Sequence, residues 1–172
     1  MNAKATGHYV TKDDELRLQY DRLFHAPIED VWYSLTNPAA TATWIGTWTG
    51  SPGTGAIMFR MTAEAPDAPW MSVSVLECEP PHRLRLHFGM GAEARSLHCH
   101  VREAAGGLTT LVFQERLTDV SSVGEIGPGW DYYLDRLAAA RNGLAMPEWS
   151  EYYPLLSDHY RNLPVPRTAD RA

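Results

Sequence analysis

The sequence predicts an α+β fold in which a curved antiparallel sheet wraps around a long C-terminal helix, with a short helical segment between the first two strands. Two observations support this class. Between residues 44 and 118, short stretches place apolar side chains at every second position, and glycine or proline separates them, as in strands with one buried face. Residues 130–141 instead repeat apolar side chains at intervals of three and four, the period of a helix. The apolar face of such a sheet must be buried against another element of the fold, and we expect this helix to be that element.

The size and charge of the chain narrow the classes of protein it can belong to. Its 172 residues, 44% hydrophobic and 21% charged, have the composition of one globular domain. The net charge of −6 argues against nucleic acid or an anionic membrane as partner, because both favour a basic face. No stretch is long and apolar enough to insert into a membrane, and the first fourteen residues lack the apolar core of a signal peptide. Cys78 and Cys99 have no CxxC spacing, so we expect reduced thiols in a cytoplasmic protein.

We expect three parts along the chain. Residues 1–14 read as a flexible polar arm, residues 15–144 as the main domain, and residues 145–172 as a helical extension with a proline-rich tail packed on the same domain. The main domain starts with a strand over residues 15–26, because its apolar side chains alternate with polar ones.

A short helix follows this first strand. Pro27 suits a first helical turn, and Glu29 and Asp30 lie where the helix dipole favours anions. Ile28 begins an apolar stripe along one side, and Asn37-Pro38 ends the helix.

Strands in hairpins are expected from residue 56 onward. The double proline Pro80-Pro81 marks the turn between two strands, and Gly106-Gly107 marks a second hairpin. The inward side chains predicted by the alternation are Ile57, Phe59, Met61, Met71, Val73, Val75, Leu84, Leu86, Phe88, Leu97, Cys99, Val101, Leu111, Phe113 and Glu115.

The long helix is expected to start at Gly127-Pro128-Gly129, with the proline near its first position and Gly143 at its end. Its inner face carries bulky side chains at spacings of three and four. They are Trp130, Tyr133, Leu134 and Leu137.

Five segments in this order resemble the START-like (SRPBCC) helix-grip superfamily, and within it the proteins similar to the C-terminal domain of the Hsp90 ATPase activator. They are "FHAPIEDVWYSLTNP" with the following Trp44, "GTGAIMFRM", "VLECEPPHRLRLHF", "GGLTTLVFQERL" and "GPGWDYYLDRL". The resemblance implies a helix-grip fold with a deep, mostly apolar cavity between sheet and long helix. It does not imply one reaction, since members bind lipids, hormones or polyketides and a minority are enzymes. The chaperone-activating role belongs to a larger protein with an additional N-terminal domain, so we expect it to transfer poorly.

A cavity in this position would be lined by the inward strand residues and by the inner face of the helix. The same helix residues could equally be ordinary core, and Trp44 and Trp48 could either gate a ligand at the mouth or pack the helix corner. The candidate ligand-binding residues are Trp44, Trp48, Phe59, Met71, Val73, Leu86, Phe88, Phe113, Glu115, Trp130, Tyr133, Leu134 and Leu137.

Glu115 is the candidate for chemistry. The alternation that turns Phe113 inward also turns Glu115 inward, and a buried carboxylate must be paired, protonated or near water. It could orient a polar ligand or act as a general acid or base. Alternatively, the strand ends early and the side chain reaches solvent.

The histidines do not predict a metal site. His98 and His100 share a strand face, but the alternation turns that face, with His87, away from the cavity and toward arginines. Cys99 points the other way and lacks an evident catalytic partner. No phosphate-binding loop, nucleophile elbow or HExxH motif occurs, so we expect neither cofactor nor metal.

Three hypotheses remain. The first is a binding protein that encloses a lipid-like or aromatic small molecule. The second keeps the cavity and adds chemistry of the cyclase, hydratase or hydrolase type, with Glu115 as base. The third is a protein-interaction role, chaperone-linked or as a homodimer, using Trp149 and Tyr152–Tyr153 as surface.

Overall fold

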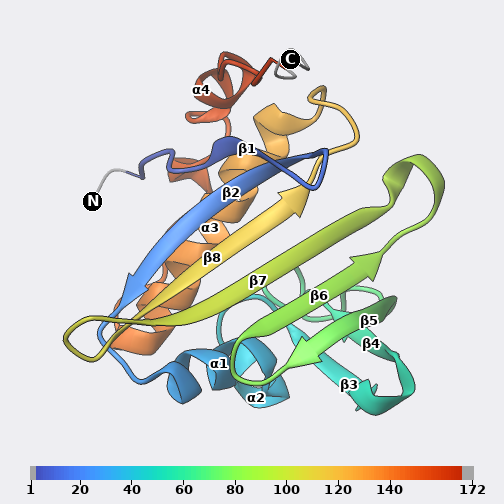
Figure 1. Cartoon of the computed structure of the whole chain (residues 1–172), viewed down its shortest axis with the longest axis vertical. Coiled ribbons are helices and arrows are strands. Elements are labelled where there is room, and N and C mark those ends of the chain that lie inside the picture. The colour runs from blue at the N-terminus through green and yellow to red at the C-terminus, as the bar shows by residue number, and fades with distance from the viewer. Residues whose placement is uncertain (1–2, 168–172) are drawn as a thin grey trace.

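The computed structural model describes residues 3–167. Its eight strands form one antiparallel sheet in the order β1-β2-β8-β7-β6-β5-β4-β3, and α3 lies behind the sheet in Figure 1. The strands are β1 (His8–Lys12), β2 (Glu15–Phe24), β3 (Thr47–Ser51), β4 (Ala56–Arg60), β5 (Met71–Glu79), β6 (Arg83–Phe88), β7 (Arg95–Ala104) and β8 (Leu108–Arg116). The helices are α1 (Ile28–Thr36), α2 (Pro38–Thr41), α3 (Val123–Asn142) and α4 (Ser157–Arg161), with 3₁₀ turns at Pro52–Thr54, Gly91–Glu93 and Trp149–Glu151. This is the α+β helix-grip arrangement that the sequence predicts, except that the short helices α1 and α2 lie between the second and third strands, because β1 precedes the strand expected to be first.

The sheet is open and consists of hairpins between consecutive strands, joined by one long-range pairing between β2 and β8. From β3 to β8 each strand pairs with the next, and β8 then pairs with β2, so Tyr20 faces Phe113 and Leu18 faces Glu115. The strand alternation holds across these pairs, because Leu97 also faces Glu115 from the other side. The inward side chains of β2, β7 and β8 therefore form one continuous surface toward α3.

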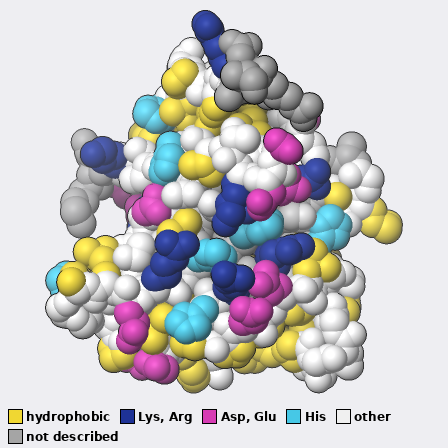
Figure 2. Space-filling model, viewed as in Figure 1, with side chains coloured by type: hydrophobic (Ala, Val, Ile, Leu, Met, Phe, Trp, Pro, Cys, Tyr) yellow, Lys and Arg dark blue, Asp and Glu magenta, His cyan; other side chains and the backbone are white. Residues whose placement is uncertain are grey.

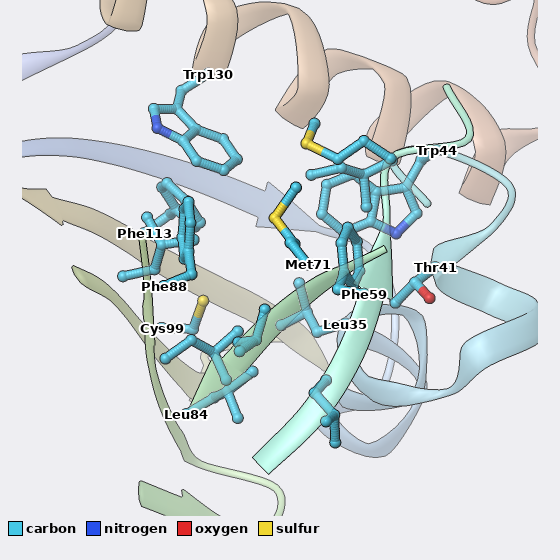
Figure 3. Close-up of a pocket in the computed structure, with 16 residues that line it drawn as sticks. Leu35, Thr41, Trp44, Phe59, Met71, Leu84, Phe88, Cys99, Phe113 and Trp130 are labelled. Atoms are coloured by element: carbon cyan, nitrogen blue, oxygen red, sulfur yellow. The ribbon is translucent and has the colours of Figure 1, made fainter. Parts of the chain in front are cut away.

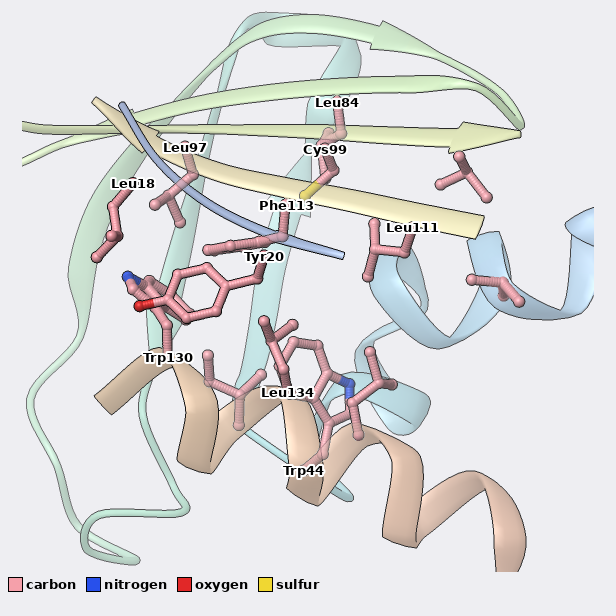
Figure 4. Close-up of a cluster of buried hydrophobic side chains, with 14 of the residues drawn as sticks. Leu18, Tyr20, Trp44, Leu84, Leu97, Cys99, Leu111, Phe113, Trp130 and Leu134 are labelled. Atoms are coloured by element: carbon pink, nitrogen blue, oxygen red, sulfur yellow. The ribbon is translucent and has the colours of Figure 1, made fainter. Parts of the chain in front are cut away.

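The core lies between that surface and α3. Figure 4 shows Trp130 and Leu134 of α3 directed at Tyr20 and Phe113 of the sheet. The rings of Phe113 and Trp130 lie 4.4 Å apart between centroids, and Leu134 and Leu137 have no exposed surface. Apolar burial of this kind stabilises by about 25 cal/mol per Å².

Residues 8–12 depart from the flexible arm expected for residues 1–14, because they form β1 and pair with β2. The turn between the two strands has only two residues, Asp13 and Asp14, with φ of 53° and 60°. Aspartate tolerates this left-handed conformation better than most residues, and two successive positive φ angles match the twist of a tight hairpin. The mostly polar sequence of residues 8–12 lacks the apolar alternation by which a strand is predicted, and β1 was therefore missed.

Helix α3 begins at Val123 and not at Gly127-Pro128-Gly129, and Pro128 lies inside it. Gly124 and Gly127 do not form a loop before the helix, as expected for Gly127, but lie within α3 and allow close packing against it. A Cβ atom at Gly127 would lie 2.2 Å from the Tyr160 ring, and one at Gly124 would lie 2.7 Å from Nε of Arg161. These two positions let the C-terminal segment approach the helix backbone, as small residues at a helix contact do.

A buried carboxylate joins four parts of the chain at this point. Asp131 is fully buried and accepts hydrogen bonds from the Thr6 hydroxyl, the Tyr160 hydroxyl and Arg22, the last at 3.3 Å. The Tyr160 hydroxyl in turn accepts from the backbone N–H of Gly7 at 3.0 Å. Burial raises the pKa of Asp131 above its ordinary value, against the opposing effect of these hydrogen bonds. Residues before β1, strand β2, α3 and α4 are thus held together by one group.

We expect Gly127→Ala to lower the free energy of unfolding by about 1–3 kcal/mol, as overpacking of a filled core does. Gly129→Ala is the matched control, because a Cβ there meets nothing within 4 Å and alanine favours a helix interior by about 0.5–1 kcal/mol. Urea denaturation of both variants measures the difference. Equal stability of the two variants would contradict the packing role of Gly127.

The raised pKa of Asp131 predicts a pH dependence. A raised folded-state pKa contributes stability that is fully present below the unfolded-state value, about 3.9, and is lost as pH rises through the folded-state value. The stability of the wild type relative to Asp131→Asn, which does not titrate, should therefore decline with rising pH in the acid range. Denaturant titrations from about pH 3 to about pH 7 measure this difference, and a constant difference would contradict it.

Candidate functional site

An apolar cavity of about 110 Å³ lies between the sheet and its helices. Figure 3 shows Trp130 above it, Phe88 and Phe113 at one side, Phe59 and Trp44 at the other, and Met71 between them. Apart from the Thr41 hydroxyl, the lining side chains are apolar or a thiol. They are Leu35, Thr41, Trp44, Ile45, Ile57, Phe59, Met61, Met71, Val73, Leu84, Leu86, Phe88, Leu97, Cys99, Phe113 and Trp130. We call this space the inner cavity.

Most of the candidate ligand-binding residues lie at the inner cavity. Those that line it are Trp44, Phe59, Met71, Val73, Leu86, Phe88, Phe113 and Trp130. Ile57, Met61, Leu84, Leu97 and Cys99 were expected to face inward but were not among the candidates, and their alternation was the signal for them. Leu35, Thr41 and Ile45 come from α1, α2 and the loop that follows them. Sequence periodicity does not predict which part of the sheet these side chains face.

The two tryptophans after α1 have different positions. The indole N–H of Trp44 donates to the Ser34 carbonyl at 2.9 Å, and that of Trp48 donates to the Thr36 carbonyl at 3.0 Å. Both therefore fasten β3 and the preceding loop to α1. Trp44 also lines the inner cavity, whereas Trp48 is absent from its lining.

Glu115 is buried, with 1% of its surface exposed, but it is not part of the cavity lining. Arg95 donates to both of its carboxylate oxygens, each at 2.6 Å, and the indole N–H of Trp130 donates to one of them. A carboxylate in this position is costly unless paired, and the pairing accounts for its burial. The ion pair also fixes Trp130 over the cavity.

Tyr133 faces a second space. Its hydroxyl donates to Glu64 at 3.1 Å, and burial, with the nearby Glu64 carboxylate, raises the pKa of Tyr133 well above its ordinary value. It lines a cleft of about 580 Å³, which we call the outer cleft. The outer cleft is lined by Met61, Ala63, Glu64, Phe88, Arg95, Glu125, Ile126, Gly129, Trp130, Tyr132, Tyr133 and Trp149. Leu134 and Leu137 line neither space and belong to the core.

The opposite face of the sheet is polar, and Figure 2 shows histidines interspersed with basic and acidic side chains there. His98 lies 3.5 Å from Arg17 and is half-buried, so burial, together with Arg17 and Arg85, lowers the pKa of His98 to about 4. Among residues 3–167, no group of three or more His, Cys, Asp or Glu side chains is arranged to hold a metal ion. Cys99 points into the core, and burial raises the pKa of its thiol to about 12.

The C-terminal segment forms an aromatic group against α3. Trp149 stacks on Tyr153 with an interplanar angle of 9°, and it packs edge-on against Tyr132. Tyr152 is buried and donates to Asp135 at 2.8 Å. Of the three aromatic residues expected at the surface, Tyr152 is therefore internal, while Trp149 remains 42% exposed.

Comparisons with solved structures agree with this architecture. CalU16 from Micromonospora echinospora superposes with a TM-score of 0.73 at 22% identity, covering 93% of this chain and 96% of that one. The protein encoded by gene BPP1335 of Bordetella parapertussis gives a TM-score of 0.71 at 23% identity, covering 96% and 97%. At such identities the likeness concerns the fold.

No helix in the described part of the chain has the length and apolar character needed to cross a membrane.

No curated protein matches the chain. The family model "Activator of Hsp90 ATPase homolog 1-like protein" matches residues 25–141, a region that contains α1, the strands β3–β8 and most of α3. Since this is well over half of the 172 residues, the chain belongs to the activator of Hsp90 ATPase homolog 1-like family.

Proposed function

We propose that the chain binds a hydrophobic, ring-containing or lipid-like small molecule, with its apolar part in the inner cavity. The observation that carries the proposal is the composition of that lining, in which aromatic and aliphatic side chains from both sheet and helices surround unfilled space. A well-packed core leaves few voids larger than a water molecule, and apolar cavities of comparable size stay dry and take up apolar guests.

The size of the inner cavity limits what it can hold. A dry cavity of about 150 Å³ is known to bind benzene, so a space of about 110 Å³ accepts one ring or a short chain. Affinity would come from apolar burial at about 25 cal/mol per Å². A larger ligand has to extend beyond this cavity.

An enzyme that uses Glu115 as base has less support. A general base needs a carboxylate within hydrogen-bond reach of a substrate proton, and here both oxygens are occupied by Arg95 and one also by Trp130. The geometry favours a structural role, in which Glu115 positions Trp130. The protein-interaction hypothesis is favoured by exposed apolar side chains of the C-terminal segment, such as Trp149 and Leu155.

We expect Val73→Phe to weaken binding of small apolar probes by at least tenfold, because the added ring occupies the inner cavity. Ser72→Phe is the matched control, since Ser72 is the preceding residue on β5 and is exposed on the other face. Thermal-shift titration with benzene measures binding, since saturation at 100 times the dissociation constant adds about 2.7 kcal/mol of stability. Equal responses of both variants, or none in the wild type, would refute the proposal.

The structural role of Glu115 gives a second prediction. Arg95→Met should lower the free energy of unfolding by about 3–5 kcal/mol at most, because it leaves a buried carboxylate without its cation. Adding Glu115→Leu to that variant should restore part of the loss, since the uncompensated charge is then removed. Chemical denaturation of wild type, both single variants and the double variant completes the cycle. Additive losses would show that the pair is not coupled.

A further inference from the structure

The inner cavity and the outer cleft adjoin each other. Met61, Phe88 and Trp130 line both spaces, so the two spaces are neighbours, and a molecule too long for the inner cavity would extend past these three side chains into the outer cleft. The outer cleft is also the larger, about 580 Å³ against about 110 Å³. Unlike the inner cavity, it has charged side chains in its wall. Their charges indicate which kind of group it accepts.

The charged side chains in the wall of the outer cleft are Glu64, Glu125 and Arg95. Glu64 and Glu125 are both exposed, and the Tyr133 hydroxyl holds Glu64 at the cleft wall. Arg95 is the cation of this lining, but its charge is compensated by Glu115 through two hydrogen bonds of 2.6 Å. With that ion pair counted as neutral, the two glutamates leave the cleft negative.

Arg136 is the cation that lies behind this wall. Its guanidinium donates to the Tyr132 hydroxyl at 3.2 Å and to the Trp44 carbonyl at 2.7 Å. It therefore faces the loop after α2 and is not part of the cleft lining. The guanidinium also lies 5.4 Å from the centroid of the Tyr132 ring, so it already occupies one side of that ring, and its single charge is fewer than the two of the glutamates.

Four aromatic rings of the same wall form a continuous series. The centroids of Trp130 and Tyr133 are 6.1 Å apart, those of Tyr133 and Tyr132 are 5.2 Å apart, and those of Tyr132 and Trp149 are 5.2 Å apart. The faces of such rings attract cations, ammonium groups included, by about 0.5–2 kcal/mol each. Arg95 already lies 5.8 Å from the Trp130 ring and 5.5 Å from Phe88, so this wall accommodates a cation.

We propose that the outer cleft binds the cationic end of an amphipathic ligand, an amine or quaternary ammonium group, while the apolar part of the same ligand occupies the inner cavity. This inference rests on the proposed function and adds the charge of the ligand to it. Glu64 and Glu125 supply the counter-charge, and Tyr133 and Trp149 supply the ring faces. A carboxylate of the same length is disfavoured by both.

Three probes of equal chain length test the proposal: octylammonium, 1-octanol and octanoate. Calorimetric titration of the full chain at low salt should show octylammonium binding about tenfold more tightly than octanol, and octanoate more weakly than octanol. The preference should shrink at high salt, because exposed charges are screened. Octanol binding without a preference for the ammonium, or tightest binding of octanoate, would overturn this inference alone. Binding of none of the three would overturn the proposed function with it.

A pair of double variants assigns the preference to the cleft. Glu64→Gln with Glu125→Gln should bring octylammonium within about twofold of octanol and leave octanol affinity unchanged. Glu79→Gln with Glu103→Gln changes the net charge by the same amount at exposed positions on β5 and β7, and it should keep the preference. If both double variants behave alike, the effect comes from overall charge and the assignment to this cleft is wrong.

Discussion

The structure depends on one mismatch of dimensions, between a broad apolar sheet face and a narrow helix. Eight strands spaced about 4.8 Å apart span roughly 35 Å, whereas a helix with its side chains is about 10 Å across. Helix α3 therefore covers the region around β2 and β8 and cannot also cover β4 and β5. The remaining face is closed by α1, α2 and the loop that carries Trp44, and the inner cavity lies where these covers meet.

Two buried acids hold α3 at its distance from the sheet. Asp131 fastens one side of the helix to Thr6, Arg22 and Tyr160. One residue earlier, Trp130 donates to Glu115 on the sheet side, and Arg95 completes that ion pair. Buried carboxylates with several donors are directional in a way that apolar contacts are not. Hydrogen bonds on two sides of α3 therefore fix its position. Because the helix does not depend on apolar packing alone for its position, the rings between helix and sheet can leave a cavity.

The same arrangement explains why the two spaces differ in character. Side chains from β4–β8 reach the inner cavity only from the apolar face of the sheet, so its wall is almost free of polar groups. The outer cleft lies where the sheet face ends and the loop after β4 meets the first turns of α3, so Glu64, Glu125 and Arg95 appear beside the rings. A ligand spanning both spaces would be apolar at one end and charged at the other.

The fold class and most of the cavity wall could be predicted from the sequence by itself, because both follow from periodicity. Alternation along β4–β8 turned Phe59, Val73 and Phe113 inward, and it also placed Glu115 inside. Alternation does not predict which residue of a distant segment an inward side chain contacts. Arg95 at the start of β7 and the short distance from Gly127 to Tyr160 join residues 20 or more positions apart, and no local pattern encodes such contacts.

The departures from expectation have the same cause. Residues 8–12 form an edge strand because Asp13 and Asp14 make a tight turn beside β2. Helix α3 begins at Val123, and Gly124 and Gly127 of its first turns lie against Arg161 and Tyr160. Local sequence determined which side chains face the interior, since a strand or helix sets that by its own period. Only the tertiary structure decided how far α3 stands from the sheet, because that distance is set by contacts between remote segments.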